Sequence, residues 1–195
     1  DMPGWVYAAV RVGDTLWLLS RLSWFLARND DAERYAARAV ATLQPLGDGH
    51  ELAMAYSNLA QLRMLATDAE AAEAWGQRAL ALAARIGDTE VEMHAPNNVG
   101  AALGCTDRAL EGRDLLLRSL RLALAADAHE HVGRAYTNLV SCAAVDRRFA
   151  EALQHVESGI AYCEERDLDS WTRYLQSWQV VSLTELGRWN EAVAV

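Results

Sequence analysis

Three asparagines recur at a constant 40-residue spacing, namely Asn58, Asn98 and Asn138. Each side-chain amide offers both a hydrogen-bond donor and an acceptor, so a row of amides is suited to holding the backbone of an extended peptide. Five further residues lie about one helical turn from these amides in the sequence or continue the same row; they are Met54, His94, Arg134, Tyr174 and Gln61. The alternative is that each amide binds a neighbouring helix and sets the register of packing.

The other reactive residue types do not form a recognisable catalytic pattern. His129 and His131 are two residues apart, whereas metal-binding histidines on one helix face need a spacing of three or four. Cys142 and Cys163 have no obvious histidine partner in the spacing and are expected to be buried thiols. We therefore expect no enzyme activity in this segment, no cofactor and no metal.

The 40-residue spacing extends well beyond the asparagines. Val40, Leu80, Leu120 and Ile160 form one apolar series, and a second series consists of small residues. The small series contains Ala32, Ala72, Gly112, Ala152 and Ala192. Self-similarity at a fixed period of this length indicates an array of stacked structural repeats.

Within each repeat the apolar residues follow helical periodicity. Leu52, Ala55, Leu59, Leu62 and Ala66 are separated by 3, 4, 3 and 4 residues, which predicts one apolar helix stripe. Short polar turns between such stretches predict antiparallel helix pairs. The sequence therefore predicts an all-α solenoid of helical hairpins, as one domain over 1–195. Its expected parts are a lead-in 1–13, repeats 14–46, 47–86, 87–126 and 127–168, and an incomplete repeat 169–195.

Local signals refine the expected helix ends. Gly47 and Gly87 are expected to end helices in a left-handed conformation. The stretches 48–51 and 127–130, which begin with Asp and end with Glu, and the stretch 89–92, which begins with Thr and ends with Glu, are interpreted as capping boxes. Pro96 lies inside the first helix of the third repeat and removes a backbone hydrogen bond, so a kink or a late helix start is predicted there.

Composition excludes several classes of function. The chain has 195 residues, 52 % of them hydrophobic, and a net charge of −9, which argues against direct contact with nucleic acid. No apolar run approaches about 20 residues, so no membrane span is expected. Three widely spaced cysteines are typical of a reduced, cytoplasmic protein. Because the pattern stops within a repeat, we expect the segment to be part of a larger protein.

These residues resemble the tetratricopeptide repeat family. The resemblance lies in Leu59-Ala60 and Val99-Gly100 in first helices, and in the small pairs Ala72 with Ala79 and Ala152 with Gly159 in second helices. The 40-residue period here is longer than the usual one of about 34, and Arg63 stands where an aromatic residue is usual. Longer units of this kind are similar to the sensor region of large LuxR-type, MalT-like bacterial regulators, and stretches such as 90–100 and 129–140 look like the actinobacterial members.

The resemblance implies a function for the asparagine row. In tetratricopeptide proteins the first helix of each pair lines a concave face, so the eight residues named above would form a groove for a peptide, a protein or a small effector. The segment would then be a non-catalytic interaction and sensing module of a LuxR-type transcriptional regulator. The alternative is a self-associating scaffold without a small ligand, which would make the chain a homo-oligomer.

Overall fold

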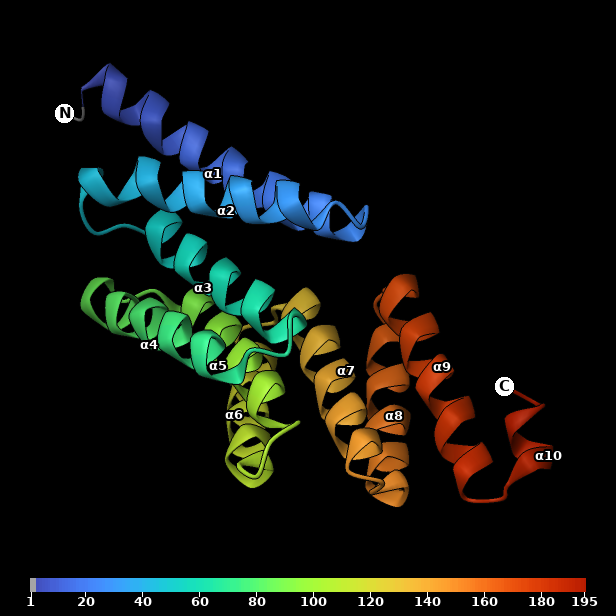
Figure 1. The fold of residues 1–195 in the computed structure, drawn as a ribbon. Helices are drawn as coiled ribbons and strands as arrows, with labels where there is room; N and C mark the ends of the chain where they lie inside the picture. Colours follow the sequence, from blue (N-terminus) through green and yellow to red (C-terminus); the bar gives the residue numbers. More distant parts are fainter. Residues whose placement is uncertain (1–2) are drawn as a thin grey trace. The chain divides into compact units, whose positions relative to one another are not determined.

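A computed structural model describes residues 3–195, and in this range every regular element is a helix (Figure 1). The prediction of an all-α fold is confirmed. The elements are α1 (Gly4–Phe25), α2 (Asn29–Leu43), the 3₁₀ turn η1 (Gln44–Leu46), α3 (His50–Leu65), α4 (Ala69–Ile86), α5 (Thr89–Leu103), α6 (Ala109–Ala125), α7 (His129–Val145), α8 (Phe149–Glu164), α9 (Asp169–Glu185) and α10 (Trp189–Ala192). Residues 4–13, predicted as a lead-in, belong to α1.

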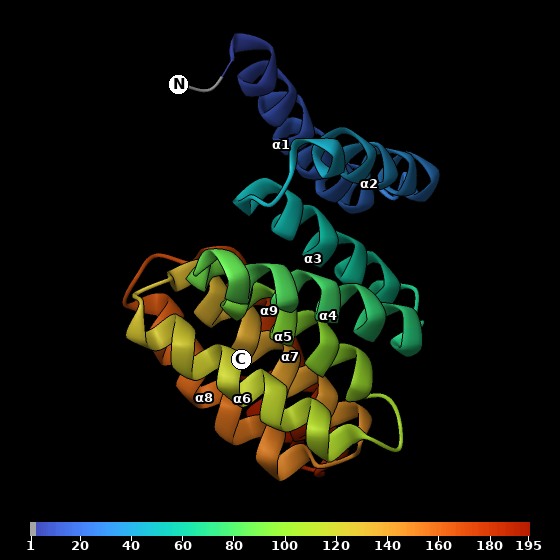
Figure 2. The same ribbon diagram turned by 90° about the vertical axis from the view of Figure 1, so that its left-hand side faces the viewer.

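Contacts divide the chain into two compact units where the sequence predicted one continuous domain. Unit 1 is Asp1–Val99 and unit 2 is Gly100–Val195, so the division falls within α5. Each unit consists of helices that pack against their neighbours in chain order, as a repeat array requires. In unit 1, α1 packs against α2 and α3, and α3 packs against α4 (Figure 2). In unit 2, α7 packs against α6, α8 and α9.

The 40-residue period is visible in the backbone of the turns. Residues with positive φ occur at Ala27, Thr67, Arg147 and Gly187, and a second such series occurs at Gly47, Gly87, Asp127 and Asp167. At most of these turns the next residue donates its N–H to a carbonyl five residues earlier, as Asp68 does to Arg63 and Arg148 to Ala143. These bonds close the helix end and reverse the chain, which places successive helices antiparallel.

Gly87 adopts the predicted left-handed conformation, with φ 70° and ψ 38° after the last turn of α4. The same prediction is wrong for Gly47, which has φ 95° and ψ −169°. The predicted capping boxes are wrong. Gly49 and Ala128 stand at the N-caps of α3 and α7, and Asp48 instead accepts a hydrogen bond from Arg85 Nε at 2.8 Å. In both cases the Asp carboxylate cannot cap the helix because the Asp lies one residue before the N-cap position.

Thr67→Gly is expected to raise the free energy of unfolding by about 0.5–1 kcal/mol. Thr67 has φ 60°, a conformation that costs a non-glycine residue about 1–2 kcal/mol, and glycine removes this cost while adding about 0.5–1 kcal/mol of chain entropy. The measurement is urea denaturation followed by circular dichroism. The reverse change Gly87→Ala is the matched control, and it should lower stability; an increase for both variants would contradict the prediction.

Small residues line the interior of each unit. Ala32, Ala72 and Ala152 from the predicted series are fully buried, and Gly112 is buried in α6. In unit 2 the end of α5 lies close to α6, where a Cβ on Gly112 would lie 2.5 Å from the carbonyl oxygen of Gly100. Glycine lowers the stability of a helix, but Gly100 and Gly104 lack a Cβ and so allow close contact with Gly112 and Cys142, respectively.

Helix α5 begins at Thr89 and is continuous through Pro96 to Leu103, so the predicted late start is wrong. The Asp88 carboxylate accepts a hydrogen bond from the Val91 N–H at 3.0 Å and holds the first turn in place. Val91 and Ala95 are fully buried in the core of unit 1. Burial of these side chains offsets the cost of proline in a helix interior, which is about 3 kcal/mol.

Candidate binding site

Asn58 and Asn98 are buried, which corrects the prediction that all three amides face a groove. Asn58 is 1 % exposed, and its Nδ2 donates to Ser20 Oγ of α1 at 2.9 Å. Asn98 is fully buried, and its Nδ2 donates to the backbone carbonyl of Ser57 in α3 at 2.8 Å. Both amides therefore connect the first helix of one repeat to the first helix of the repeat before it. This is the register-setting role that the sequence left open.

His94 and Met54, which were also predicted to face the groove, are buried as well. Ser57 Oγ lies 2.7 Å from His94 Nδ1, and Asn98 Nδ2 lies 3.3 Å from the same atom. Because the amide nitrogen can only donate, we assign His94 Nδ1 as an acceptor with the proton on Nε2. Ser57, His94 and Asn98 thus form one polar cluster inside unit 1.

The remaining predicted residues have mixed exposure. Arg134 is buried in α7, Gln61 and Asn138 are half-buried, and Tyr174 on α9 is 48 % exposed. A single polar face formed by all eight residues is therefore not present. The physical reason is that the first helices of successive repeats pack against each other. Residues one turn apart on the packed side of such a helix face the neighbouring helix rather than solvent.

The structure shows a different candidate surface in unit 2, which we call the α7–α9 hollow. It has a volume of about 340 Å³. Its lining residues come from α7, the following turn, the start of α8, and α9; they are Ala144, Val145, Arg147, Phe149, Trp178, Val181 and Glu185. Val145 is 55 % exposed and Val181 is 44 % exposed, so apolar side chains are accessible here. Arg147 Nη2 lies 3.5 Å from Glu185 Oε2 at one side of the hollow.

The sequence indicates this hollow at one position, Trp178, which the series of periodic asparagines does not include. Trp178 follows Asn138 by one repeat period, so the fourth member of the row is an indole rather than an amide. Trp178 packs against the core cluster of unit 2 that includes Val140 and Leu175. The change from asparagine to tryptophan in this periodic series indicates that the surface becomes more apolar at the last repeat.

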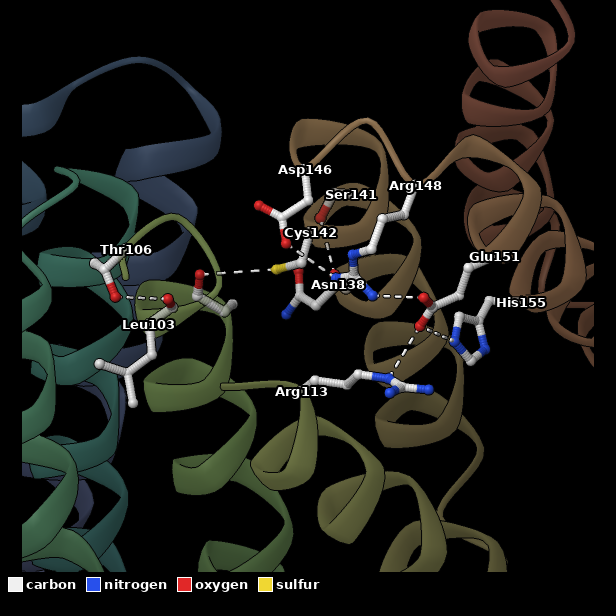
Figure 3. A network of polar contacts seen from close by, with 11 residues as sticks. Leu103, Thr106, Arg113, Asn138, Ser141, Cys142, Asp146, Arg148, Glu151 and His155 are labelled. Carbon is white, nitrogen blue, oxygen red and sulfur yellow. Dashed lines mark hydrogen bonds and ion pairs between the residues drawn. The ribbon is translucent and has the colours of Figure 1, made fainter. Parts of the chain in front are cut away.

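A polar network joins α6 to α8 within unit 2 (Figure 3). Glu151 accepts a hydrogen bond from Arg148 Nη1, and its other oxygen lies 2.9 Å from Arg113 Nε. His155 Nε2 lies 3.8 Å from Glu151, and burial lowers the pKa of His155 below 6.5 despite the opposing effect of this carboxylate. Two guanidinium groups satisfy the carboxylate, so the network is suited to holding the helices together.

The cysteines give a prediction for thiol labelling. Cys142 and Cys163 are buried as predicted, while Cys105 is exposed, and burial raises the pKa of Cys142 to about 12. Because the thiolate is the reactive form, we expect one fast-reacting thiol in the native protein at pH 8 and three after denaturation. Titration with an aromatic disulfide reagent measures this. Two or three fast thiols in the native protein would contradict it.

His50 gives a prediction for pH dependence in unit 1. Its Nδ1 lies 2.6 Å from Asp88 Oδ2, joining the starts of α3 and α5. Partial burial lowers the pKa of His50, but the hydrogen bond and charge of Asp88 outweigh it, so the pKa ends above 6.5. A raised folded-state pKa gives stability that is fully present below the unfolded pKa of about 6.5 and is lost as pH rises through the folded pKa.

The expected result is that His50→Gln lowers stability at pH 6 and has no effect at pH 9. The side chain is 42 % exposed, so solvent screening limits the loss to under about 1 kcal/mol. Urea denaturation of both proteins at the two pH values measures it. An equal loss at both values would show that the charge on His50 is not responsible.

Two further findings concern the described part of the chain. Within residues 3–195, no three His, Cys, Asp or Glu side chains are grouped as metal ligands. His129 Nδ1 instead lies 2.8 Å from Tyr162 Oη. No helix in this range has the length and apolar character that crossing a bilayer requires.

The comparisons with known proteins support the fold. No family model matches the chain, and no curated protein matches it in sequence. Among solved structures, BtubC (BKLC) from P. vanneervenii is similar, with a TM-score of 0.71 and 18 % identity over 97 % of this chain and 83 % of that one. At this identity the likeness shows a shared helical fold and leaves function to be argued from the site.

Proposed function

We propose that this chain is a non-catalytic repeat module that binds a segment of another protein. The observation that supports it is the α7–α9 hollow, an open and accessible surface lined mainly by apolar and aromatic side chains, with Arg147 and Glu185 at one side. Exposed apolar surface of this kind is where protein partners bind, because its burial provides most of the binding free energy. The buried amides of unit 1 support the module by holding its helices in register.

The parent protein, in this proposal, is a cytoplasmic LuxR-type transcriptional regulator. The proposal rests on the resemblance of stretches such as 90–100 and 129–140 to such regulators. A bound segment would favour one packing arrangement of the repeats and so change how they contact the ATPase and DNA-binding parts expected of that family. Sequencing the flanking gene regions tests this part. An upstream phosphate-binding loop and a downstream helix-turn-helix domain are expected, and a gene without them would contradict it.

Photo-crosslinking in the native host tests the binding function directly. A benzophenone amino acid replaces Val181 in the hollow or, as a control, Leu124 on α6, which is similarly exposed. We expect position 181 to crosslink to one defined segment of another protein, identified by mass spectrometry, and a synthetic peptide of that segment to compete. Crosslinks that are equally diverse at both positions would contradict a specific site.

A self-associating scaffold is the second candidate, favoured by the exposed apolar row on α1. Trp5, Val12, Leu19, Leu22 and Leu26 are separated by 7, 7, 3 and 4 residues and are all exposed. This spacing places them on one side of the helix, as in a helix–helix contact. Sedimentation at several concentrations tests it: Leu22→Glu should weaken any self-association, whereas a monomeric native protein would exclude the scaffold.

A further inference from the structure

The α7–α9 hollow has a repeat-equivalent counterpart in unit 1. Positions in the two regions differ by three repeat periods. The ends of α1 and α7, at Phe25 and Val145, and the ends of α3 and α9, at Leu65 and Glu185, obey this relation. The two regions can therefore be compared position by position, as two versions of one contact between first helices.

In unit 1 the region is occupied by the chain's own tryptophan. Trp24 lines two separate hollows of about 130 and 10 Å³. It packs against the core of unit 1 and stacks edge-on against Phe25 with ring centroids 5.3 Å apart. The indole thus divides and largely fills the space between the ends of α1 and α3.

In unit 2 the same positions carry smaller side chains. Ala144 replaces Trp24 and Val145 replaces Phe25, and the space becomes one continuous hollow of about 340 Å³. The small side chain of Ala144 leaves open the space that Trp24 occupies in unit 1, while α9 contributes a different indole, Trp178, to the lining of the same hollow.

Two positions in the unit 2 hollow have changed from polar to apolar, whereas Arg147 and Glu185, which pair at one side of it, stand where unit 1 has Ala27 and Leu65. The pair formed by Asn58 and Ser20 in unit 1 corresponds to Trp178 and Val140 in unit 2. Gln61, which lines the smaller hollow of unit 1, corresponds to Val181. Away from this ion pair, the loss of the two amides favours an apolar occupant, since no buried amide would then lose its hydrogen bonds.

We infer that the α7–α9 hollow takes an aromatic side chain, tryptophan above all, from a segment of the bound protein. This inference rests on the proposed function and specifies its ligand. The bound indole lies where Trp24 lies in unit 1, between Ala144, Phe149 and Trp178. Burying an indole removes about 150–250 Å² of surface from water, so it is a suitable anchor for a longer segment.

A polypeptide segment is favoured over a free aromatic metabolite by the openness of the site. Val145 and Val181 remain about half exposed, and small-molecule sites bury most of their ligand. A side chain within a segment gains additional contacts along the neighbouring surface of α9, where Val180 is also exposed.

The test is a nuclear magnetic resonance titration of the full chain with N-acetyl-L-tryptophanamide, which mimics a tryptophan residue within a peptide. We expect millimolar binding, with chemical shift changes confined to residues around the hollow such as Val145 and Val181. Ala144→Trp, which fills the hollow from within, should weaken binding at least tenfold. Val181→Glu should do the same, and Leu124→Glu on α6 is the matched control that should bind like the native protein.

Three outcomes would overturn the inference. One is the lack of any shift at 10 mM probe, on the order of tenfold above the dissociation constant expected for a single side chain. Another is equal binding of N-acetyl-L-leucinamide, which would remove the aromatic preference. The third is a change of the same resonances when the protein alone is diluted, which would identify a second copy of the chain as the occupant.

The failure of this inference can be separated from the failure of the proposed function. If the probe does not bind but position 181 still crosslinks to a defined protein segment, the binding function stands and the aromatic anchor is wrong. If neither the probe nor any segment binds, both are wrong. Trp24→Ala gives an independent check, because it should open a second hollow in unit 1 and add a second set of probe-induced shifts there.

Discussion

Gly112→Ala is expected to lower the free energy of unfolding by about 3 kcal/mol, although its repeat-equivalents at 32, 72 and 152 are all alanine. A Cβ at this position would lie 2.5 Å from the Gly100 carbonyl oxygen and 2.8 Å from the Gly104 amide nitrogen. Both contacts are to backbone atoms, which cannot rotate away as a side chain can. The end of α5 and α6 would have to separate, and the cavities formed around Leu116 would add to the cost.

Urea denaturation followed by circular dichroism measures the effect. Gly4→Ala is the control, because no atom lies within 4 Å of the position that its Cβ would occupy. This variant should have unchanged or slightly higher stability, since alanine favours a helix more than glycine does. A Gly112→Ala variant as stable as the native protein would show that α6 can move without loss, and that the close contact is not required.

Asn98→Ala is expected to lower the free energy of unfolding by about 2–3 kcal/mol. The change leaves the buried Ser57 carbonyl and His94 Nδ1 without the amide donor, and it leaves a small cavity between α3 and α5. A groove residue that serves only a ligand would lose affinity on this change with little loss of stability. The prediction therefore distinguishes the structural role of the asparagine from the binding role that its spacing first suggested.

Denaturant titration of single and double variants measures the effect. A double-mutant cycle with Ser57→Ala should give a coupling energy above about 0.5 kcal/mol, because both side chains belong to one cluster. Tyr174→Ala is the matched control from the same predicted set, and its exposed side chain should contribute within about 0.5 kcal/mol. Equal losses for Asn98 and Tyr174 would contradict the assignment of Asn98 to the interior.

Prediction from the sequence succeeded where a property depends on neighbouring residues alone. The helical periodicity around Leu59 predicted α3, and the glycine at position 87 predicted the end of α4. The late helix start predicted at Pro96 was wrong, because the cost of proline is a local quantity and the burial of Val91 and Ala95 that offsets it comes from distant residues. Residues 1–13 are predicted only as a lead-in because the repeat pattern is weak there, and the structure begins α1 at Gly4.

The candidate site also separates the properties that depend on the sequence alone from those that depend on helix packing. The constant spacing correctly indicated that Asn58 and Asn98 occupy equivalent places, but it carried no information on which side of the helix is covered. Whether an amide faces solvent or the preceding helix depends on how closely two helices approach, and here Ser20 and Ser57 are near enough to bond. Likewise, Ala144 lines the α7–α9 hollow where its larger counterpart Trp24 lies between two smaller hollows, a difference that matters only once both are placed between packed helices.

The sequence by itself determined that this protein is built from helical repeats with a 40-residue period, because the recurrence of apolar and small residues follows directly from the geometry of stacked hairpins. Only the tertiary structure decided which members of each periodic series are interior and which are accessible. The reason is that burial depends on the distance between segments one repeat apart, and that distance is set by the summed size of all the side chains between the helices.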